Sequence, residues 1–491
     1  MRKLLFWSAT SLLFVLGSVS PLAAQKAKLR KAEAAMMALR YQQAIHIYEK
    51  IHNKHPDLPE PILALARAYR KLGRLEQAEM WYTKALLVPE VPAEAYYQYG
   101  QLLFQQDDCE GAQLAFQTFL QLKPYDERRW QLTDVCAYRA QLFSRGAQRT
   151  QLELPDFNGP YSDLGPAFYG KGLVFGSVRP GPNDREAFYD LYYTEALGES
   201  GKDYTAVSPF SATINGQMHE AILTFSPDGQ EVYFTRNQPG ALSEKNPLHL
   251  LEIMIARKDS TGQWSQLEPL PFNDHQYSTA HPALSADGQR LFFSSDRPGG
   301  FGGTDIYVSQ RMGRSWSTPV NLGPKVNTEG DELFPFFHAS GELYFASDGQ
   351  LGLGGQDIFR VEELGPGQWG RVENLGVPIN SAADDFGLIL NESAQLGYFT
   401  SNRVGGKGDD DIYAFRPRAL VLELQFTDQQ HQALDQAISF RIRGSELAYR
   451  TNEKGFFTQK LNFDECLYMQ LTDNNFLPLA REICATESQL A

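Results

Sequence analysis

Cysteine is scarce in this chain, with only four in 491 residues. That number is too small for a fold held together mainly by disulfides, and no CxxC pair or His/Cys spacing predicts a zinc site. The sequence also lacks GxSxG, HExxH and P-loop patterns, which argues against several common hydrolase and nucleotidase classes. After the opening segment, no apolar run is long enough to span a bilayer. The sequence therefore contains none of the common catalytic motifs considered above.

The four cysteines fall two by two toward opposite ends of the chain. Cys109 and Cys136 lie in the N-terminal third, and Cys466 and Cys484 lie in the C-terminal third. In an oxidising compartment, one disulfide can form within each pair. Four buried, unpaired thiols are the alternative.

Residues 1–24 have the pattern of a secretory signal peptide. Arg2 and Lys3 precede an apolar run, which ends in small residues around Ala24. We therefore expect the protein to be exported. No cysteine lies near the expected cleavage point, so we expect no lipid-attachment site of the bacterial lipoprotein kind.

Charge is distributed unevenly along the chain, whose net charge is −14. Residues 25–148 contain 17 Lys/Arg and 14 Asp/Glu, whereas residues 149–417 contain 19 Lys/Arg and 35 Asp/Glu. An acidic middle argues against nucleic-acid binding, and it is compatible with cations, basic partners or simple solubility.

Residues 25–148 are helical by pattern. A small residue followed four positions later by an aromatic one recurs every 34 residues, at Ala44/Tyr48, Ala78/Tyr82 and Ala112/Phe116. This spacing resembles that of the tetratricopeptide-repeat family, and residues 64–86 are the most similar. The resemblance implies three repeats, a capping helix at about residues 126–146 and a concave groove that binds other proteins. The side chains expected to face this groove are Arg67, Arg70, Lys71, Tyr97 and Phe104. Ordinary solvated helix surface is the alternative for each of them.

A thirteen-residue phrase occurs three times in residues 149–417. It reads SDRPGGFGGTDIY at 295–307, SDGQLGLGGQDIF at 347–359 and SNRVGGKGDDDIY at 401–413. Each copy ends one strand, turns through a glycine-rich loop and begins another strand. Turn signals between two apolar runs occur at residues 226–229, 285–288 and 338–341, with degenerate copies at 166–181 and 388–403. The region therefore contains five units, which predicts a five-bladed β-propeller. Residues 151–159 are expected to supply the outer strand of the fifth blade and so close the ring. The repeats resemble the WD40-like PD40 units of TolB-type propellers.

Residues 418–491 change to short alternating strands, which predict a small β-sandwich. The T-x-x-x-G-F pattern from Thr451 to Phe456 resembles that of carboxypeptidase regulatory-like domains. The predicted fold class is therefore multidomain α+β: a helical solenoid at residues 25–148, a propeller at 149–417 and a sandwich at 418–491.

Two positions recur at the predicted channel mouth of the propeller. The first is acidic in four of five units: Asp163, Glu220, Thr279, Glu332 and Asp385. The second is basic in four of five: Arg179, Arg236, Arg297, Gly349 and Arg403. A ring of structural ion pairs is the simplest interpretation. Because the gaps at Thr279 and Gly349 do not coincide, one carboxylate and one guanidinium remain over. This face, together with His281 in a neighbouring loop, is the predicted site for a ligand or partner.

The glycine-loop aspartates, Asp305, Asp357 and Asp411, are positioned to accept N–H bonds from the turns that precede them. A calcium site around residues 409–411 is conceivable, but consecutive strand residues alternate faces and cannot all converge. No metal site and no cofactor is predicted.

The order of signal peptide, tetratricopeptide array, PD40 propeller and regulatory-like sandwich resembles the PorE-like periplasmic subunits of the type IX secretion system in Bacteroidetes. That resemblance implies a non-enzymatic periplasmic scaffold that binds envelope proteins near the outer membrane, and peptidoglycan or glycan indirectly. We expect this chain to lack the family's OmpA-like domain and its acylated cysteine. The alternatives are a glycan- or peptide-binding propeller and a glycoside hydrolase that uses channel carboxylates.

Overall fold

The computed structural model describes residues 21–37, 40–56, 58–89, 91–179, 188–197, 203–238, 250–428, 430, 432, 434, 436–442, 448–462, 466–472 and 479–484. The chain divides into two compact units, one of residues 1–106 with 114–124 and one of residues 107–113 with 125–491. Most of the predicted signal peptide lies outside the described residues. Within the described ranges, no helix is both long and apolar enough to cross a bilayer.

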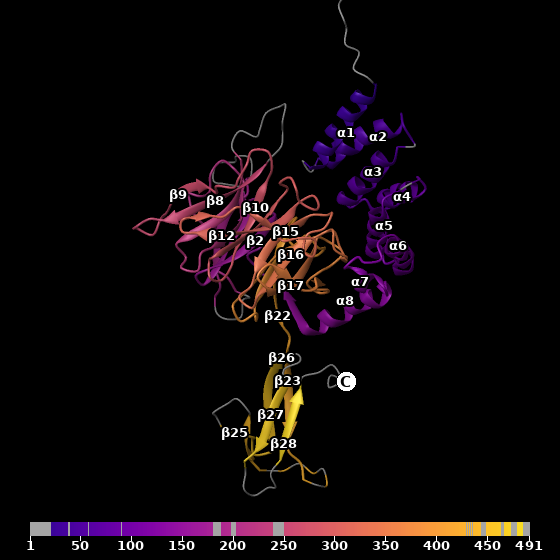
Figure 1. Cartoon of the computed structure of the whole chain (residues 1–491). Coiled ribbons are helices and arrows are strands. Elements are labelled where there is room, and N and C mark those ends of the chain that lie inside the picture. The colour runs from indigo at the N-terminus through magenta and orange to yellow at the C-terminus, as the bar shows by residue number, and fades with distance from the viewer. Residues whose placement is uncertain are drawn as a thin grey trace, which may run out of the picture. The chain divides into compact units, whose positions relative to one another are not determined.

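Helices account for the N-terminal part of the chain (Figure 1). They are α1 (Pro21–Met37), α2 (Tyr41–His52), α3 (Pro59–Lys71), α4 (Leu75–Leu86), α5 (Ala93–Gln105), α6 (Cys109–Leu122), α7 (Arg129–Leu132) and α8 (Val135–Arg149). The residues that recur every 34 positions are core residues, because Ala44, Ala78 and Ala112 are fully buried and the aromatic partners are at most 2% exposed. A small residue at this position lets the paired helices approach closely, and the aromatic ring fills the space beside it.

In the described part of residues 150–417, five antiparallel sheets follow the helices, each with its strands largely in chain order. The first contains β2 (Asp163–Tyr169), β3 (Gly172–Ser177), β4 (Asp190–Glu195) and β5 (Ser208–Pro209). The second contains β6 (Glu220–Phe225), β7 (Glu231–Asn237), β8 (Leu251–Lys258) and β9 (Trp264–Pro269). The third contains β10 (Thr279–Leu284), β11 (Arg290–Ser295), β12 (Asp305–Met312), β13 (Ser315–Trp316) and β14 (Val320–Asn321). The fourth contains β15 (Glu332–Phe337), β16 (Glu342–Ser347), β17 (Asp357–Gly365), β18 (Gln368–Trp369) and β19 (Glu373–Asn374).

The fifth sheet closes the ring. It contains β20 (Asp385–Leu390), β21 (Gly397–Ser401), β22 (Asp411–Pro417) and, as its outer strand, β1 (Thr150–Glu153). β1 pairs antiparallel with β22, so that Thr150 lies opposite Pro417. The inner strands β2, β6, β10, β15 and β20 contact one another in that order, and β20 contacts β2 again. The sheets therefore form a closed ring in which the segment before the first sheet completes the last one.

Every inner strand carries the same bulge at its third residue. The five bulge residues have φ between 48° and 64°: Gly165, Ile222, His281, Phe334 and Gly387. The pairing register shifts at this point in each sheet, as it does between Leu164 and Ala167. Two of the bulge side chains pack on each other, since the His281 and Phe334 rings stack 3.9 Å apart. Gly165 leaves room for Ile222, whose side chain would overlap a Cβ at that position.

An asparagine joins each sheet to the segment that leads into the next one. Its side chain accepts the N–H and donates to the C=O of a single residue near the start of a third strand. The pairs are Asn215 with Leu191, Asn273 with Ile253, Asn327 with Ile306, Asn380 with Ile358, and Asn158 with Ile412. The pair that includes Asn158 joins residues 254 positions apart and lies at the ring closure.

Two small sheets form the C-terminal region. One pairs β23 (Ala419–Gln425) with β26 (Phe456–Asn462). The other has the order β25 (Ala448–Arg450), β24 (Ser439–Ile442), β27 (Cys466–Leu471) and β28 (Ala480–Cys484). They share a core around Phe440, Leu461, Leu467 and Met469.

Both cysteine pairs are disulfides. Cys109 is joined to Cys136, which links the start of α6 to α8. Cys466 is joined to Cys484 directly across the β27–β28 ladder.

Candidate functional site

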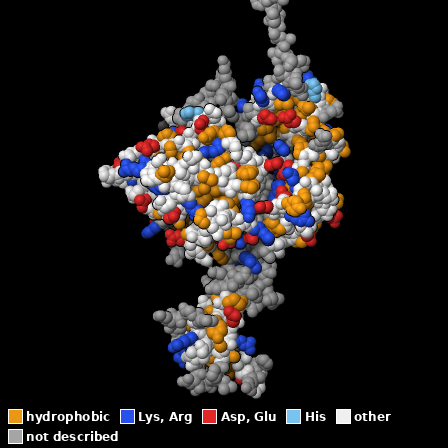
Figure 2. Space-filling model, viewed as in Figure 1, with side chains coloured by type: hydrophobic (Ala, Val, Ile, Leu, Met, Phe, Trp, Pro, Cys, Tyr) orange, Lys and Arg blue, Asp and Glu red, His pale blue; other side chains and the backbone are white. Residues whose placement is uncertain are grey.

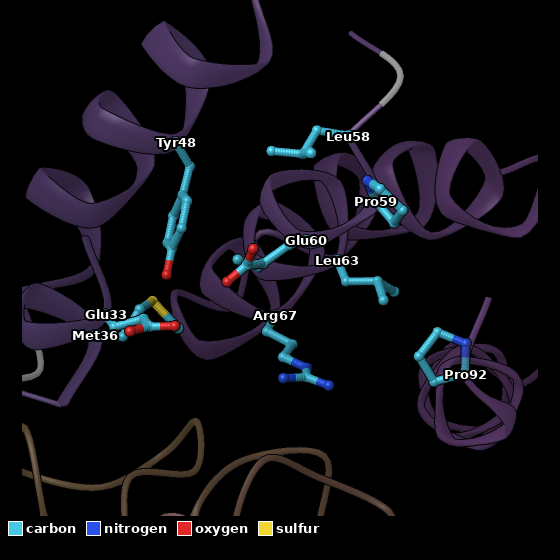
Figure 3. A pocket seen from close by; sticks show the side chains of 10 residues that line it. Glu33, Met36, Tyr48, Leu58, Pro59, Glu60, Leu63, Arg67 and Pro92 are labelled. Carbon is cyan, nitrogen blue, oxygen red and sulfur yellow. The ribbon is translucent and has the colours of Figure 1, made fainter. Parts of the chain in front are cut away.

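A hollow of about 550 Å³ opens in the helical array. It is lined by residues of α1, α2 and α3, by Leu58 at the start of α3 and by Pro92 at the start of α5. The complete lining is Glu33, Met36, Tyr48, Leu58, Pro59, Glu60, Leu63, Ala64, Arg67 and Pro92. In Figure 3 the carboxylates of Glu33 and Glu60 lie near the Tyr48 hydroxyl, whereas the labelled leucines and prolines lie toward the other end. The hollow therefore has a polar end and an apolar end.

Tyr48 is the buried polar group of this hollow. Its side chain is only 2% exposed, and its hydroxyl points into the space beside Glu33 and Glu60 (Figure 3). Within the described part of the chain, this hydroxyl has no hydrogen-bond partner. Burial raises the pKa of Tyr48 above its ordinary value, and the charges of Glu33 and Glu60 raise it further. The phenol is therefore neutral and can donate a hydrogen bond into the hollow.

The predicted groove residues divide into two groups. Arg67 lines the hollow, and its Nε donates to Gln98 Oε1 at 3.0 Å. Arg70 donates to Gln101 Oε1 at 3.1 Å, and Lys71 is exposed. The expectation that Tyr97 and Phe104 face the groove is wrong, because they are 1% and 0% exposed.

The physical reason lies in the packing between α5 and α6. The Tyr97 ring lies 5.5 Å from that of Phe116 and 5.3 Å from that of Phe119. It is therefore part of an aromatic core rather than a surface for ligands. A helical pattern assigns a residue to a face of its helix, but it does not show which face a neighbouring helix covers.

At the ring, the five predicted acid positions are the first residues of the five inner strands, and all are buried. Asp163 is paired with Arg179 of the same sheet at 3.0 Å, and Asp385 is paired with Arg403. Arg403 also donates to the backbone carbonyls of Pro378 and Ile379. These two pairs hold the ends of loops, and neither carboxylate is open to solvent. The geometry corresponds to structural ion pairs.

Arg236 does not occupy the position that the sequence repeat predicts. The residue opposite the inner acid is Ser177 in the first sheet, whereas it is Arg236 in the second. The position equivalent to Arg179 is therefore Gln238, two residues later. Arg236 pairs instead with Glu252, at 2.7 Å. The shift arises because the third-strand acid of this sheet lies directly across the ladder from Arg236.

Among the described residues, two inner acids consequently have no arginine partner. Glu220 accepts the backbone N–H of Gly216 at 3.2 Å, and burial raises its pKa to about 7. Glu332 is fully buried and accepts hydrogen bonds of 2.7 Å from Thr328 N–H, Thr328 Oγ1 and Ser347 Oγ. Burial outweighs these hydrogen bonds and raises the pKa of Glu332 to about 8. Gly349 stands where the first, third and fifth sheets have an arginine. An added Cβ at Gly349 would overlap the Thr328 hydroxyl, so this hydroxyl occupies the space beside Gly349.

Arg297 is the arginine of the third sheet, in which Thr279 takes the place of the inner acid. Within the described residues no carboxylate lies within ion-pair distance of it, and it donates to Ser295 and Thr279 hydroxyls. Aromatic rings surround it, with Tyr307 and Tyr277 at 4.9 and 5.1 Å. Burial lowers the pKa of Arg297. This guanidinium is held by hydroxyls and rings rather than by a free anion.

The remaining predicted residues have structural surroundings. His281 lies within β10 at the bulge and not in a loop, which corrects the expectation for this residue. The glycine-loop aspartates stabilise their turns as expected: Asp357, for example, accepts the N–H groups of Leu353 and Gly354 at 2.7 and 2.8 Å. Asp410 bonds to the Ser162 hydroxyl rather than converging with its neighbours. In Figure 2, acidic and basic side chains are interspersed on the visible face of the ring.

Comparison with known proteins assigns the helical region. A tetratricopeptide-repeat family profile matches residues 35–87. Tetratricopeptide repeats are present. No curated protein matches the chain.

The solved structures that resemble the chain fall into two groups. The first TPR domain of Spaghetti (RPAP3), bound to an HSP90 peptide, is 22% identical, covers 24% of this chain and 93% of its own, and has a TM-score of 0.23. A GH43 endo-arabinanase from Bacillus licheniformis is 13% identical over 57% of this chain and 99% of its own, with a TM-score of 0.37. A gluconolactonase from Xanthomonas campestris is 14% identical over 57% and 93%, with a TM-score of 0.34. The sheet-rich region thus has propeller-like neighbours, and these likenesses carry no functional argument.

Proposed function

We propose that this protein is a non-enzymatic scaffold whose helical array binds a segment of a partner protein. The observation that carries the proposal is the hollow lined mainly by α1, α2 and α3, into which the hydroxyl of the buried Tyr48 side chain points without a hydrogen-bond partner among the described residues. Tetratricopeptide repeats are commonly used to bind other proteins on their concave face. A hydroxyl that opens into the hollow can bond there to water or to a polar group of a ligand.

The finer architecture belongs to the same proposal. We propose that the five sheets act as a five-bladed propeller of the TolB type and that the C-terminal sheets form a regulatory-like β-sandwich. A non-enzymatic role is supported by the burial of the inner acids, since Glu332 and Asp385 are 0% exposed. A glycoside hydrolase or a glycan-binding face would need carboxylates that a sugar can reach.

Location and assembly are also proposed. The N-terminal pattern and the domain order favour an exported, periplasmic protein in a PorE-like, outer-membrane-associated assembly of the type IX secretion kind. Two disulfides are compatible with an oxidising compartment. The partners would then be other envelope proteins.

Site-specific cross-linking tests the groove. A photo-crosslinking amino acid at Ala64, which lines the hollow, is compared with one at the exposed Gln77 of α4. We expect position 64, and not position 77, to give a defined adduct with an envelope protein. Ala64→Arg should reduce binding of that partner, because the larger side chain would occupy the hollow, whereas Gln77→Arg should leave binding unchanged. Equal labelling from both positions, or no adduct from position 64, would contradict the proposal.

A further inference from the structure

The polar end of the hollow has more hydrogen-bonding capacity than the described protein uses. Glu33 and Glu60 are exposed and form no ion pair among the residues that the structure describes. The Tyr48 hydroxyl, from a side chain that is 2% exposed, points into the space beside them and has no hydrogen-bond partner in the described ranges (Figure 3). Two carboxylates accept hydrogen bonds, and a neutral phenol can both donate and accept. Together they match a group that carries several N–H donors.

The charge balance of the hollow favours a cation. Its lining contains two carboxylates and one guanidinium, that of Arg67. Arg67 donates through Nε to Gln98 of α5, so part of its donor capacity is already engaged. The net charge of the lining is therefore negative. A carboxylate ligand at the polar end would be repelled by Glu33 and Glu60, and an ammonium or guanidinium would be attracted.

The other end of the hollow is apolar. Leu58, Pro59, Leu63 and Pro92 line it, and Met36 lies near Glu33 (Figure 3). The volume of about 550 Å³ lies within the range of roughly 300–1,000 Å³ that is usual for small-ligand pockets. It is large enough for two adjacent side chains of a peptide. The polar and apolar ends together describe a segment with one basic and one apolar side chain.

We infer that the hollow binds a lysine or arginine side chain of a partner segment, with an apolar side chain of the same segment seated against Leu58, Leu63 and Pro92. The positively charged group lies between the carboxylates of Glu33 and Glu60. Tyr48 Oη contacts this group or the adjoining peptide carbonyl. This inference rests on the proposed partner-binding role of the array and adds the chemistry of what it binds.

The test uses the full exported chain and a positional-scanning library of N-acetylated, C-amidated octapeptides. Blocked termini ensure that any preference for charge comes from side chains. Retained peptides should be enriched in lysine or arginine at one position, with a large apolar residue nearby. Glu33→Gln/Glu60→Gln should weaken the best basic peptide about tenfold. Its lysine-to-norleucine analogue should bind both proteins equally.

Matched variants separate charge from fold. Glu76→Gln/Glu110→Gln removes two exposed carboxylates that do not line the hollow, and it should leave retention unchanged. Glu33→Lys/Glu60→Lys should shift the preference to acidic peptides. Tyr48→Phe should weaken the basic peptide about threefold with no loss of thermal stability, because the hydroxyl has no internal bond to lose.

The possible failures are distinguishable. If peptides are retained through the hollow without a preference for a basic residue, or if the Glu33/Glu60 double variant retains them equally, this inference is wrong and the proposed function stands. If Ala64→Arg retains the same peptides as the unaltered protein, or if no peptide is retained, both the inference and the groove-binding role are wrong.

Discussion

Asn158 lies at the closure of the ring, and we expect it to stabilise this closure. Its side chain accepts the Ile412 N–H and donates to the Ile412 C=O, both at 2.8 Å, and it is 5% exposed. Asn158→Ala leaves both backbone groups buried without this partner. Each such loss costs about 1–3 kcal/mol, so the local stability of this closure should fall by about 2–6 kcal/mol. Asn158→Asp keeps the acceptor but loses the donor, and it should have an intermediate effect.

Hydrogen exchange at the Ile412 amide measures this loss directly. In the unaltered protein the amide should exchange slowly, and in Asn158→Ala its protection should fall together with that of the β1–β22 ladder. Asn327→Ala is the matched control, because Asn327 makes the same two bonds to Ile306 but does not join the two ends of the ring. It should affect Ile306 and leave β1 protected. Unchanged protection of the Ile412 amide in Asn158→Ala would refute the stabilising role of Asn158.

Three further predictions concern buried charge, cross-links and packing. Because the folded protein keeps the Glu332 proton up to a pKa of about 8, whereas an unfolded chain releases it near its ordinary value, stability should fall as pH rises through this window. Glu332→Gln should reduce the fall in Tm between about pH 5 and 8; an equal fall would contradict the assignment. Replacing Cys109 and Cys136 by serine opens a loop with a sequence separation of 27 residues and should cost about 3.5 kcal/mol in chemical denaturation; a change under about 1 kcal/mol would contradict the loop-closure estimate. Gly349→Ala should cost about 1–3 kcal/mol by overlap, whereas Gly365→Ala, with no close neighbour, should be nearly neutral.

Strand boundaries were the most predictable part of the ring. The repeated phrase places a strand end at Ser295 and a new start at Asp305, as the structure has them. The outer strand from before the first sheet was also predictable, because residues 151–159 resemble the outer strand of the third sheet. Both features depend on local pattern, which a glycine-rich turn and alternating apolar residues make visible.

The asparagine repeat was missed although the sequence contains a signal for it. Asn158, Asn215, Asn327 and Asn380 each precede an inner acid by five residues, and Asn273 precedes Thr279 by six. The spacing varies by only one residue because the asparagine must reach back to a neighbouring strand while its loop leads into the next inner strand. The bulges had no such signal, since their residues share a backbone angle and not a side-chain type.

The error at Arg236 shows a limit of counting along a repeat. A shift of two residues preserves the alternation of faces, so the apolar pattern cannot detect it. Only the ladder register, in which Arg236 lies opposite Glu220, reveals the shift. The burial of Tyr97 and Phe104 has a similar origin, because packing between helices is not encoded in the period of one helix.

The hydrogen bonding of the charged groups favours the helical hollow over the ring face as the binding site that we propose. Around the ring, the arginine gap at Gly349 and the acid gap at Thr279 are both compensated: Thr328 and Ser347 bind Glu332, and hydroxyls and rings surround Arg297. A site that has already satisfied its charges gains little from a ligand. In the helical hollow, the Tyr48 hydroxyl points into the space, and Glu33 and Glu60 form no ion pair among the residues that the structure describes. Tyr48 was recognised from the repeat, and its side chain is buried as the other repeat aromatics are; its hydroxyl points into the hollow that we propose as the binding site.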